Sequence, residues 1–296
     1  MYALKNDTLQ IKIKRIGAEL CNITSIKNNT EFMWQADTKI WGSHAPNLFP
    51  IIGVMKNNSY TYNGKLYKMT KHGFVRKNDA FSIKHKTETS ITFSLTSNNA
   101  LYKMYPFLFQ FEITYTLKNN TLTINYTIKN TDKKTLYFSV GGHPAFNCPI
   151  NSNENYTDYF LEFENEESSK SYVLNMANGL VTNTKKPVFT EGNKIKLHEH
   201  LFNEDALIFK DLKSRKVALK HNTKGRVLSM NFNDFPYLGI WAKPNAPYVC
   251  IEPWLGIADT EDTNQKIEAK EGILSLNAGA IFNANYSIQI DQRHLV

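Results

Sequence analysis

The chain is poor in cysteine and has no long apolar run, and each shortage excludes a class of protein. Only three of 296 residues are cysteine, and no Cys-x-x-Cys occurs. This argues against a disulfide framework and against a cysteine-based zinc site. No apolar run approaches the ~20 residues that span a bilayer, and the first residues lack the apolar segment of a signal peptide. We therefore expect reduced thiols, a cytoplasmic location and no membrane partner.

The common nucleotide-binding and hydrolase motifs are also missing. The sequence contains no Gly-x-x-x-x-Gly-Lys-Ser/Thr, no Gly-x-Gly-x-x-Gly, no His-Glu-x-x-His and no Gly-x-Ser-x-Gly. These patterns bind phosphates or dinucleotides, ligate zinc or present a nucleophilic serine. No other ligand spacing suggests a metal site, so we expect neither a metal nor a cofactor.

Positive charge exceeds negative charge, with 35 Lys and Arg against 27 Asp and Glu and a formal net charge of +8. The lysines are spread among asparagines and form no dense basic run. This pattern favours a solvated basic surface over a nucleic-acid partner. One alternative is left by this pattern: a cleft with a basic mouth that attracts an anionic substrate.

Strand periodicity dominates the chain, since apolar and polar residues alternate in many short segments. Asn63-Gly64 between two such segments is a hairpin signal, and 118–121 reads as a second hairpin turn. Helical periodicity is confined to one or two turns at 199–205. We expect an all-β fold, a large antiparallel β-sandwich of two stacked sheets, and with no linker evident one domain over 1–296. The clearest predicted strands are 9–14, 91–95, 111–117, 122–128 and 286–290.

Two segments carry a proton-transfer side chain beside residues that fix the backbone. His143 lies in Gly141-Gly142-His143-Pro144, and Glu252 lies in the apolar stretch around Pro253. Unperturbed histidine and glutamate have pKa values of about 6.5 and 4.3, so they form a candidate acid/base couple. The alternatives are a structural histidine bonded to backbone, and a glutamate in a salt bridge to a lysine or arginine.

Further candidates surround these two in a weaker pattern. His72 and Arg76 flank an apolar stretch and are a fair anchor for hydroxyls or an anion, against the alternative of a surface turn. Asp205 precedes an apolar strand and has an ordinary turn aspartate as its alternative. Trp254 and Trp241 are candidate platforms for a sugar ring, because an aromatic face packs against C–H groups. We expect His44 to be structural and the other histidines to be at the surface, namely His85, His198, His200, His221 and His294.

With these residues assembled, the chain resembles the aldose 1-epimerase (galactose mutarotase) family, and most of all its LacX-like bacterial branch. The resemblance covers nearly the whole chain, and its motifs stand in the family's order. It implies a single-domain galactose mutarotase-like supersandwich with a sugar site in a cleft on one sheet. The matching segments are His44-Ala45-Pro46 with 48–53, His72-Gly73-Phe74-Val75-Arg76, Gly141-Gly142-His143-Pro144-Ala145-Phe146-Asn147, Asn203-Glu204-Asp205-Ala206-Leu207 and Glu252-Pro253-Trp254-Leu255-Gly256.

The resemblance also implies roles for single residues. Glu252 matches the family's general base and His143 its general acid, while His72, Arg76 and Asp205 match positions that bind or orient the sugar. Two positions depart from the pattern. Lys56 stands near where relatives often have an arginine, and Lys71 stands where the hexose-6-phosphate branch often has a glutamine. Lys56 is an imperfect substitute, because lysine cannot form arginine's bidentate clamp. Lys71 bears on the detail of the substrate.

The resemblance predicts an enzyme that interconverts the α and β anomers of a hexose without metal or cofactor. Its partner is a small sugar rather than nucleic acid or membrane, and the protein is a monomer or homodimer. One alternative is a phosphosugar mutarotase whose phosphate site is made by Arg76, Lys71 and Lys56. The other is a non-catalytic carbohydrate-binding protein of the same fold, although pure binding needs no acid/base couple.

Overall fold

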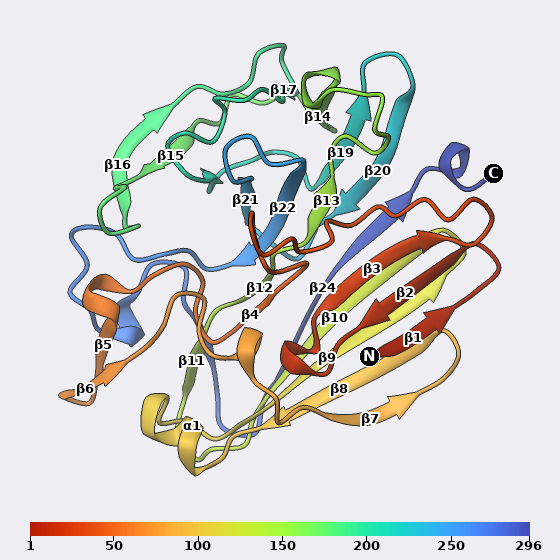
Figure 1. Cartoon of the computed structure of the whole chain (residues 1–296). Helices are drawn as coiled ribbons and strands as arrows, with labels where there is room; N and C mark the ends of the chain where they lie inside the picture. Colours follow the sequence, from red (N-terminus) through yellow and green to blue (C-terminus); the bar gives the residue numbers. More distant parts are fainter.

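Antiparallel strands make up nearly all regular structure in the computed structural model, which describes residues 1–296 (Figure 1). The expected all-β class is confirmed, with one short α-helix, α1 (Asn99–Met104), and a few 3₁₀ turns. No helix is long and apolar enough to cross a membrane. The strands form a nine-stranded sheet, an eight-stranded sheet and three small sheets.

The nine-stranded sheet is built around a long hairpin. The two strands of this hairpin, β9 (Phe109–Lys118) and β10 (Thr121–Asn130), alternate buried residues with half-buried or exposed ones, because only one face meets the core. Their register pairs Lys118 with Thr121 across the predicted turn. The strand order is β17 (Lys194–Lys196), β14 (Tyr159–Phe163), β19 (Lys216–His221), β20 (Gly225–Asn231), β24 (Ile281–Ile290), β10 (Thr121–Asn130), β9 (Phe109–Lys118), β8 (Ser90–Thr96) and β7 (Ser82–Lys86).

The eight-stranded sheet is shorter in its strands and is centred on β22, which is buried along its whole length. Because both its faces are covered, β22 has no polar face and reads as a continuous apolar run broken by Glu252. The order is β16 (Val181–Lys186), β15 (Ser171–Leu174), β18 (Leu207–Phe209), β21 (Tyr237–Trp241), β22 (Tyr248–Leu255), β12 (Val140–Gly142) and β4 (Asn47–Leu48), with β13 (Ala145–Asn147) also on β22.

The small sheets complete the molecule. The N-terminal three-stranded sheet packs on the nine-stranded one, where Tyr2 meets Phe93 edge to face with ring centroids 5.5 Å apart (Figure 1). The hairpin of β5 and β6 turns at Asn63-Gly64, as predicted, with both residues at positive φ. These sheets comprise β1 (Tyr2–Lys5), β2 (Leu9–Ile13) and β3 (Leu20–Ser25); β5 (Ser59–Tyr62) and β6 (Lys65–Lys68); and β11 (Leu136–Phe138) with β23 (Leu274–Leu276).

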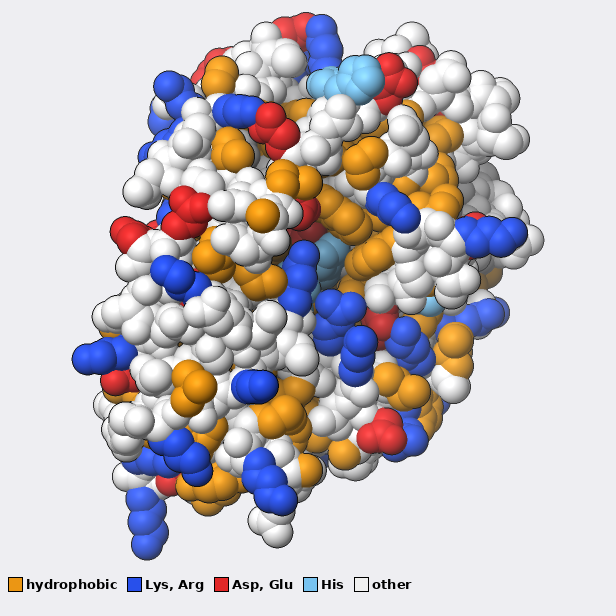
Figure 2. Space-filling model, turned by 60° about the vertical axis from the view of Figure 1, so that its left-hand side comes forward, with side chains coloured by type: hydrophobic (Ala, Val, Ile, Leu, Met, Phe, Trp, Pro, Cys, Tyr) orange, Lys and Arg blue, Asp and Glu red, His pale blue; other side chains and the backbone are white.

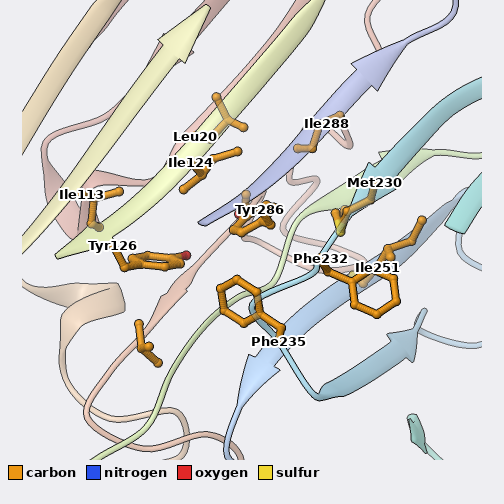
Figure 3. Close-up of a cluster of buried hydrophobic side chains, with 14 of the residues drawn as sticks. Leu20, Ile113, Ile124, Tyr126, Met230, Phe232, Phe235, Ile251, Tyr286 and Ile288 are labelled. Atoms are coloured by element: carbon orange, nitrogen blue, oxygen red, sulfur yellow. The ribbon is translucent and has the colours of Figure 1, made fainter. Parts of the chain in front are cut away.

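The main core lies between the inner face of the nine-stranded sheet and the sheets that cover it. Figure 3 shows Ile124 and Tyr286 from this face pointing toward Leu20 of β3 and Ile251 of β22. A single connected cluster of 71 buried apolar residues includes all four. The division of the chain into domains stays a prediction, that of one domain over 1–296.

Two local expectations are wrong. The segment 199–205 forms turns and no helix, and only Phe202 within it is buried, so it has no apolar stripe with which a helix could pack on the core. The α-helix lies instead at α1, where Asn98 caps the first turn by accepting a hydrogen bond from the Leu101 N–H at 2.9 Å. His221, expected at the surface, is buried edge to face on Tyr159, and its Nδ1 accepts the Thr223 N–H.

Candidate active site

Strand β22 brings its alternate residues to the outer face of the eight-stranded sheet. Ile251 points into the core (Figure 3), so Cys250, Glu252 and Trp254 point the opposite way. Gly239 lies across from Glu252 on β21, and a Cβ there would come within 2.4 Å of the Trp254 ring. Glycine at that position therefore makes room for the indole beside the carboxylate.

His143 lies in the turn between β12 and β13, and both of these strands pair with β22. Gly141 is opposite Trp254, and Ala145 is opposite Cys250. This double pairing places the imidazole Nε2 3.2 Å from Glu252 Oε2. Two segments widely separated in the sequence are thus joined by the strand register.

A buried polar network holds the backbone beside His143 from the nine-stranded sheet. The Tyr126 hydroxyl lies 2.8 Å from Asn47 Oδ1 and 3.1 Å from the Gly141 carbonyl oxygen, within hydrogen-bonding reach of both. The His143 N–H donates to the Pro46 carbonyl at 3.1 Å, and the Ala145 N–H donates to the His44 carbonyl at 2.9 Å. The residues around His44 therefore act through their backbone, as expected for a structural role.

The structure argues against purely structural roles for both residues, namely a histidine bonded to backbone and a glutamate in a salt bridge to lysine or arginine. Glu252 is 1% exposed and forms no salt bridge to lysine or arginine, and its only ion-pair contact is His143. Glu252 Oε2 and His143 Nδ1 are buried without a well-aligned hydrogen bond. Buried polar atoms are rarely left unpaired without a functional reason, so this pair is poised to receive a ligand.

Burial sets the protonation of the pair. Desolvation raises the pKa of Glu252 well above its ordinary 4.5, reinforced by Asp205 and opposed by the Lys71 ammonium and the Trp254 indole N–H. Desolvation likewise lowers the pKa of His143 to about 3, which its own carbonyl opposes and the Arg76 and Lys71 charges reinforce. Both shifts favour the neutral forms of Glu252 and His143.

His72 is buried and is held as a hydrogen-bond donor, which argues against a surface turn. Its backbone N–H donates to the Gly53 carbonyl at 2.7 Å, and its Nδ1 accepts the Gly53 N–H at 3.0 Å. Nε2 therefore carries the proton of the neutral ring. Desolvation, with His143, Lys71 and Arg76, lowers the pKa of His72 and keeps it neutral. The positive φ of His72 and of Gly73, where a Cβ would lie 2.1 Å from the Phe49 carbonyl, fixes this turn.

Two cations and one carboxylate line the same cavity. Arg76, in the 3₁₀ turn Val75–Lys77, is half-buried and has no ion-pair partner, and Lys71 has none either. Asp205 sits at positive φ, and its Oδ1 accepts only the Ala206 N–H. It is thus a turn aspartate whose carboxylate still lines the cavity.

Aromatic side chains form the walls around His143. Trp254 and Trp241, predicted as platforms, both line the cavity. Trp41, which sequence reasoning missed, stacks on the His143 ring with centroids 5.0 Å apart, and Trp241 meets that ring edge to face at 5.8 Å. Trp41 is far in sequence from the His143 and Glu252 motifs, so its sequence position did not indicate a role at the site. The only local indication was a tryptophan next to a glycine.

The cavity has a volume of about 160 Å³ and opens to solvent. Figure 2 shows histidine side chains in a hollow on this face, with Lys and Arg side chains gathered along one side. Lys56 does not reach it. Its ammonium lies on the Glu261 carbonyl at 2.5 Å, so the structure gives no support to the predicted role of Lys56 in binding. The lining residues are Trp41, Gly53, Val54, Lys71, His72, Arg76, His143, Leu174, Gly179, Asp205, Ala206, Ile208, Trp241, Glu252, Trp254 and Ala258.

The chain is similar to known proteins both in sequence and in fold. The chain matches the aldose 1-epimerase family model over residues 1–272. It is 33% identical to the plasmid and chromosomal LacX proteins of Lactococcus lactis subsp. lactis, over 97% of this chain and 98% of theirs. A galactose mutarotase related enzyme from Lactobacillus acidophilus has a similar structure, with TM-score 0.91, 37% identity and coverage of 98% and 97%. A galactose mutarotase-like protein from Lactobacillus casei also has TM-score 0.91, at 29% identity and coverage of 98% and 100%.

Proposed function

Because the chain belongs to the aldose 1-epimerase family, we propose that it is a mutarotase that interconverts the α and β anomers of a hexose. The observation that carries this proposal is the buried His143–Glu252 pair, 3.2 Å apart and free of other ion-pair partners. A protein that only binds sugar has no need of two desolvated proton-transfer groups in contact.

The proposed reaction needs a base at the anomeric hydroxyl and an acid at the ring oxygen. Glu252 removes the proton of the C1 hydroxyl while His143 donates a proton to O5, and the C1–O5 bond opens to the aldehyde. Rotation about C1–C2 presents the other carbonyl face. The two proton transfers then run in reverse and close the other anomer. Each residue thus serves as acid and as base once in every turnover.

The number of protons held by Glu252 and His143 explains how this pair can supply both an acid and a base despite its shifted pKa values. Before the reaction the pair holds one titratable proton, which is on Glu252, while His143 is neutral. Its transfer across the 3.2 Å contact gives a Glu252 carboxylate and a His143 imidazolium, the base and acid that the reaction requires. The net charge of the pair does not change, so no proton has to come from solvent.

The remaining residues would hold the sugar. The His72 N–H and the Arg76 guanidinium are donors for hydroxyl oxygens, and Asp205 is an acceptor. Trp254, Trp241 and Trp41 offer flat faces to the ring C–H groups. The charge of Lys71 opposes the rise in the pKa of Glu252 and so stabilises the ionised form of that carboxylate.

The pH dependence of catalysis follows from this proton count. We expect kcat/KM to be flat over a broad window above pH 3, because the pair keeps one proton until Glu252 ionises at its raised pKa. Activity falls above that pKa, where the pair has lost its proton. Anomer-exchange NMR at a series of pH values measures this profile, and a narrow bell centred near pH 5 would contradict it.

A phosphorylated sugar is a second candidate substrate, favoured by the two unpaired cations Arg76 and Lys71 in the cavity. Exchange rates on glucose, galactose and their 6-phosphates decide between the two. If the phosphate binds Lys71, Lys71→Met raises KM for the phosphosugar by roughly tenfold, about the worth of one charge-assisted contact, and leaves KM for the free sugar nearly unchanged. An equal change for both sugars contradicts a phosphate role. No acceleration for any aldose contradicts the mutarotase proposal.

A further inference from the structure

One buried thiol lies beside the proton-transfer pair and has no part in the proposed reaction. Cys250 and Glu252 are two residues apart on β22 and face the same way. A metal-binding atom of each of Cys250, Glu252 and His143 lies within 4.8 Å of the other two. The other two cysteines, Cys21 and Cys148, are also buried but belong to no such group.

We propose that Cys250, His143 and Glu252 form an inhibitory site for a thiophilic divalent cation such as Zn²⁺. Sulfur, imidazole nitrogen and carboxylate oxygen are the donors zinc prefers, and three protein ligands leave a fourth position open. The ligands approach one another to the spacing that a tetrahedral ion spans, since Nε2 and Oε2 are already 3.2 Å apart. Glu252 Oε2 is buried without a hydrogen-bond partner and points into this group.

Charge balance allows the cation to replace two protons without leaving a net charge in the buried site. A divalent ion with one thiolate and one carboxylate is neutral as a unit, which reduces the cost of burying it. The cavity that His143 and Glu252 line gives the ion a path from solvent, and Cys250 is fully buried beside these two residues without lining the cavity itself. The apolar surroundings that keep the thiol protonated are overcome because metal ligation deprotonates it outright.

Binding must release protons in a fixed number. The ion displaces one proton from the Cys250 thiol and the one proton held by the His143–Glu252 pair. Two protons per ion therefore enter the buffer at any pH where the pair still holds its proton. The two groups that the mutarotase proposal uses are then both ligands, so the cation and the sugar exclude each other; this inhibition rests on the proposed function, whereas the binding itself does not.

The test is direct binding of Zn²⁺ and Cd²⁺ to the purified protein without sugar. Calorimetry in buffers of different ionisation enthalpy gives the stoichiometry and the proton count, and Cd²⁺ gives an ultraviolet thiolate-to-metal charge-transfer band. We expect one ion and two protons per chain. Cys250→Ala should abolish the band and weaken binding by about 100-fold or more, since even outer partners of a metal are worth 10–100-fold.

Matched variants separate this site from chance binding. Cys21→Ala and Cys148→Ala remove equally buried thiols and should leave the band and stoichiometry intact. Binding that survives Cys250→Ala without a thiolate band, for example at the exposed His200 and Glu199, overturns the proposal. So does the absence of binding by the wild type. If binding depends on Cys250 but no aldose is turned over, the cation site stands and the mutarotase proposal fails.

Discussion

Glu252→Gln is expected to lower kcat for anomer exchange by about 10²–10⁴-fold, the usual worth of a positioned general base. The amide keeps the size and shape of the side chain but cannot take a proton from the anomeric hydroxyl. His143→Asn should cost a similar factor through loss of the proton donor. Exchange NMR on the preferred aldose measures both, and KM should change little because neither group is proposed to supply most of the binding energy.

The double variant separates a coupled pair from two independent contacts. If Glu252 and His143 act as one proton-transfer unit, Glu252→Gln/His143→Asn should be scarcely slower than the worse single variant. A double loss equal to the product of the single losses would mean that each residue acts alone. Activity retained by either single variant would remove that residue from the mechanism.

Stability provides the folding control for Glu252→Gln. The raised pKa means that the folded protein holds a proton on Glu252 that the unfolded chain has released above pH 4.5. The unfolded state therefore binds fewer protons, and wild-type stability falls as pH rises through this window. Glutamine removes that cost, so the variant should unfold at an equal or higher temperature than wild type, with an advantage that grows with pH. If Glu252→Gln has a lower Tm than wild type, its lost activity is explained by misfolding and not by the missing base.

Short-range signals in the sequence were sufficient for the hairpins and for the two principal candidates. Asn63-Gly64 specifies a turn by its own backbone preference, and the alternation on either side of 118–121 specifies the strand register. His143 and Glu252 stand out because a polar side chain in an apolar segment is costly and demands a partner. The sequence does not show that each is the other's partner, because that depends on the pairing of β12 and β13 with β22.

Features set by long-range packing could not be predicted in this way. Trp41 reaches His143 only because the loop that carries it folds over the outer face of the eight-stranded sheet. Lys56 was favoured as a sugar ligand by its position after the 48–53 motif, yet its backbone N–H is taken by Asp259 Oδ2 at 2.9 Å and its side chain turns away. One carboxylate far along the chain thus decides the direction of a lysine that the local sequence leaves free.

That same carboxylate is the basis of the second large effect, on stability. Asp259 is 3% exposed, and its Oδ1 lies 2.7 Å from the Nζ of Lys270, which is 5% exposed. Asp259→Ala leaves the Lys270 ammonium buried without its partner, at a cost of about 3–5 kcal/mol in the free energy of unfolding. Burial already lowers the pKa of Lys270, and loss of Asp259 lowers it further. The folded state then binds fewer protons than the unfolded chain, so the loss should be largest at low pH and shrink as pH rises.

Two comparisons show whether the unpaired charge is the cause. Asp259→Ala/Lys270→Met removes both charges and should recover much of the stability, because a buried ion pair adds little over an apolar pair of similar volume. Glu271→Ala breaks a pair with Lys210 of the same 2.7 Å length but with Glu271 42% exposed, and should cost only about 0–1 kcal/mol. Urea denaturation measures all three. The contrary result is a double variant no more stable than Asp259→Ala. It would mean that this part of the fold is held together by the contacts of Asp259 with Lys56 and the neighbouring cavity wall, and not by its charge.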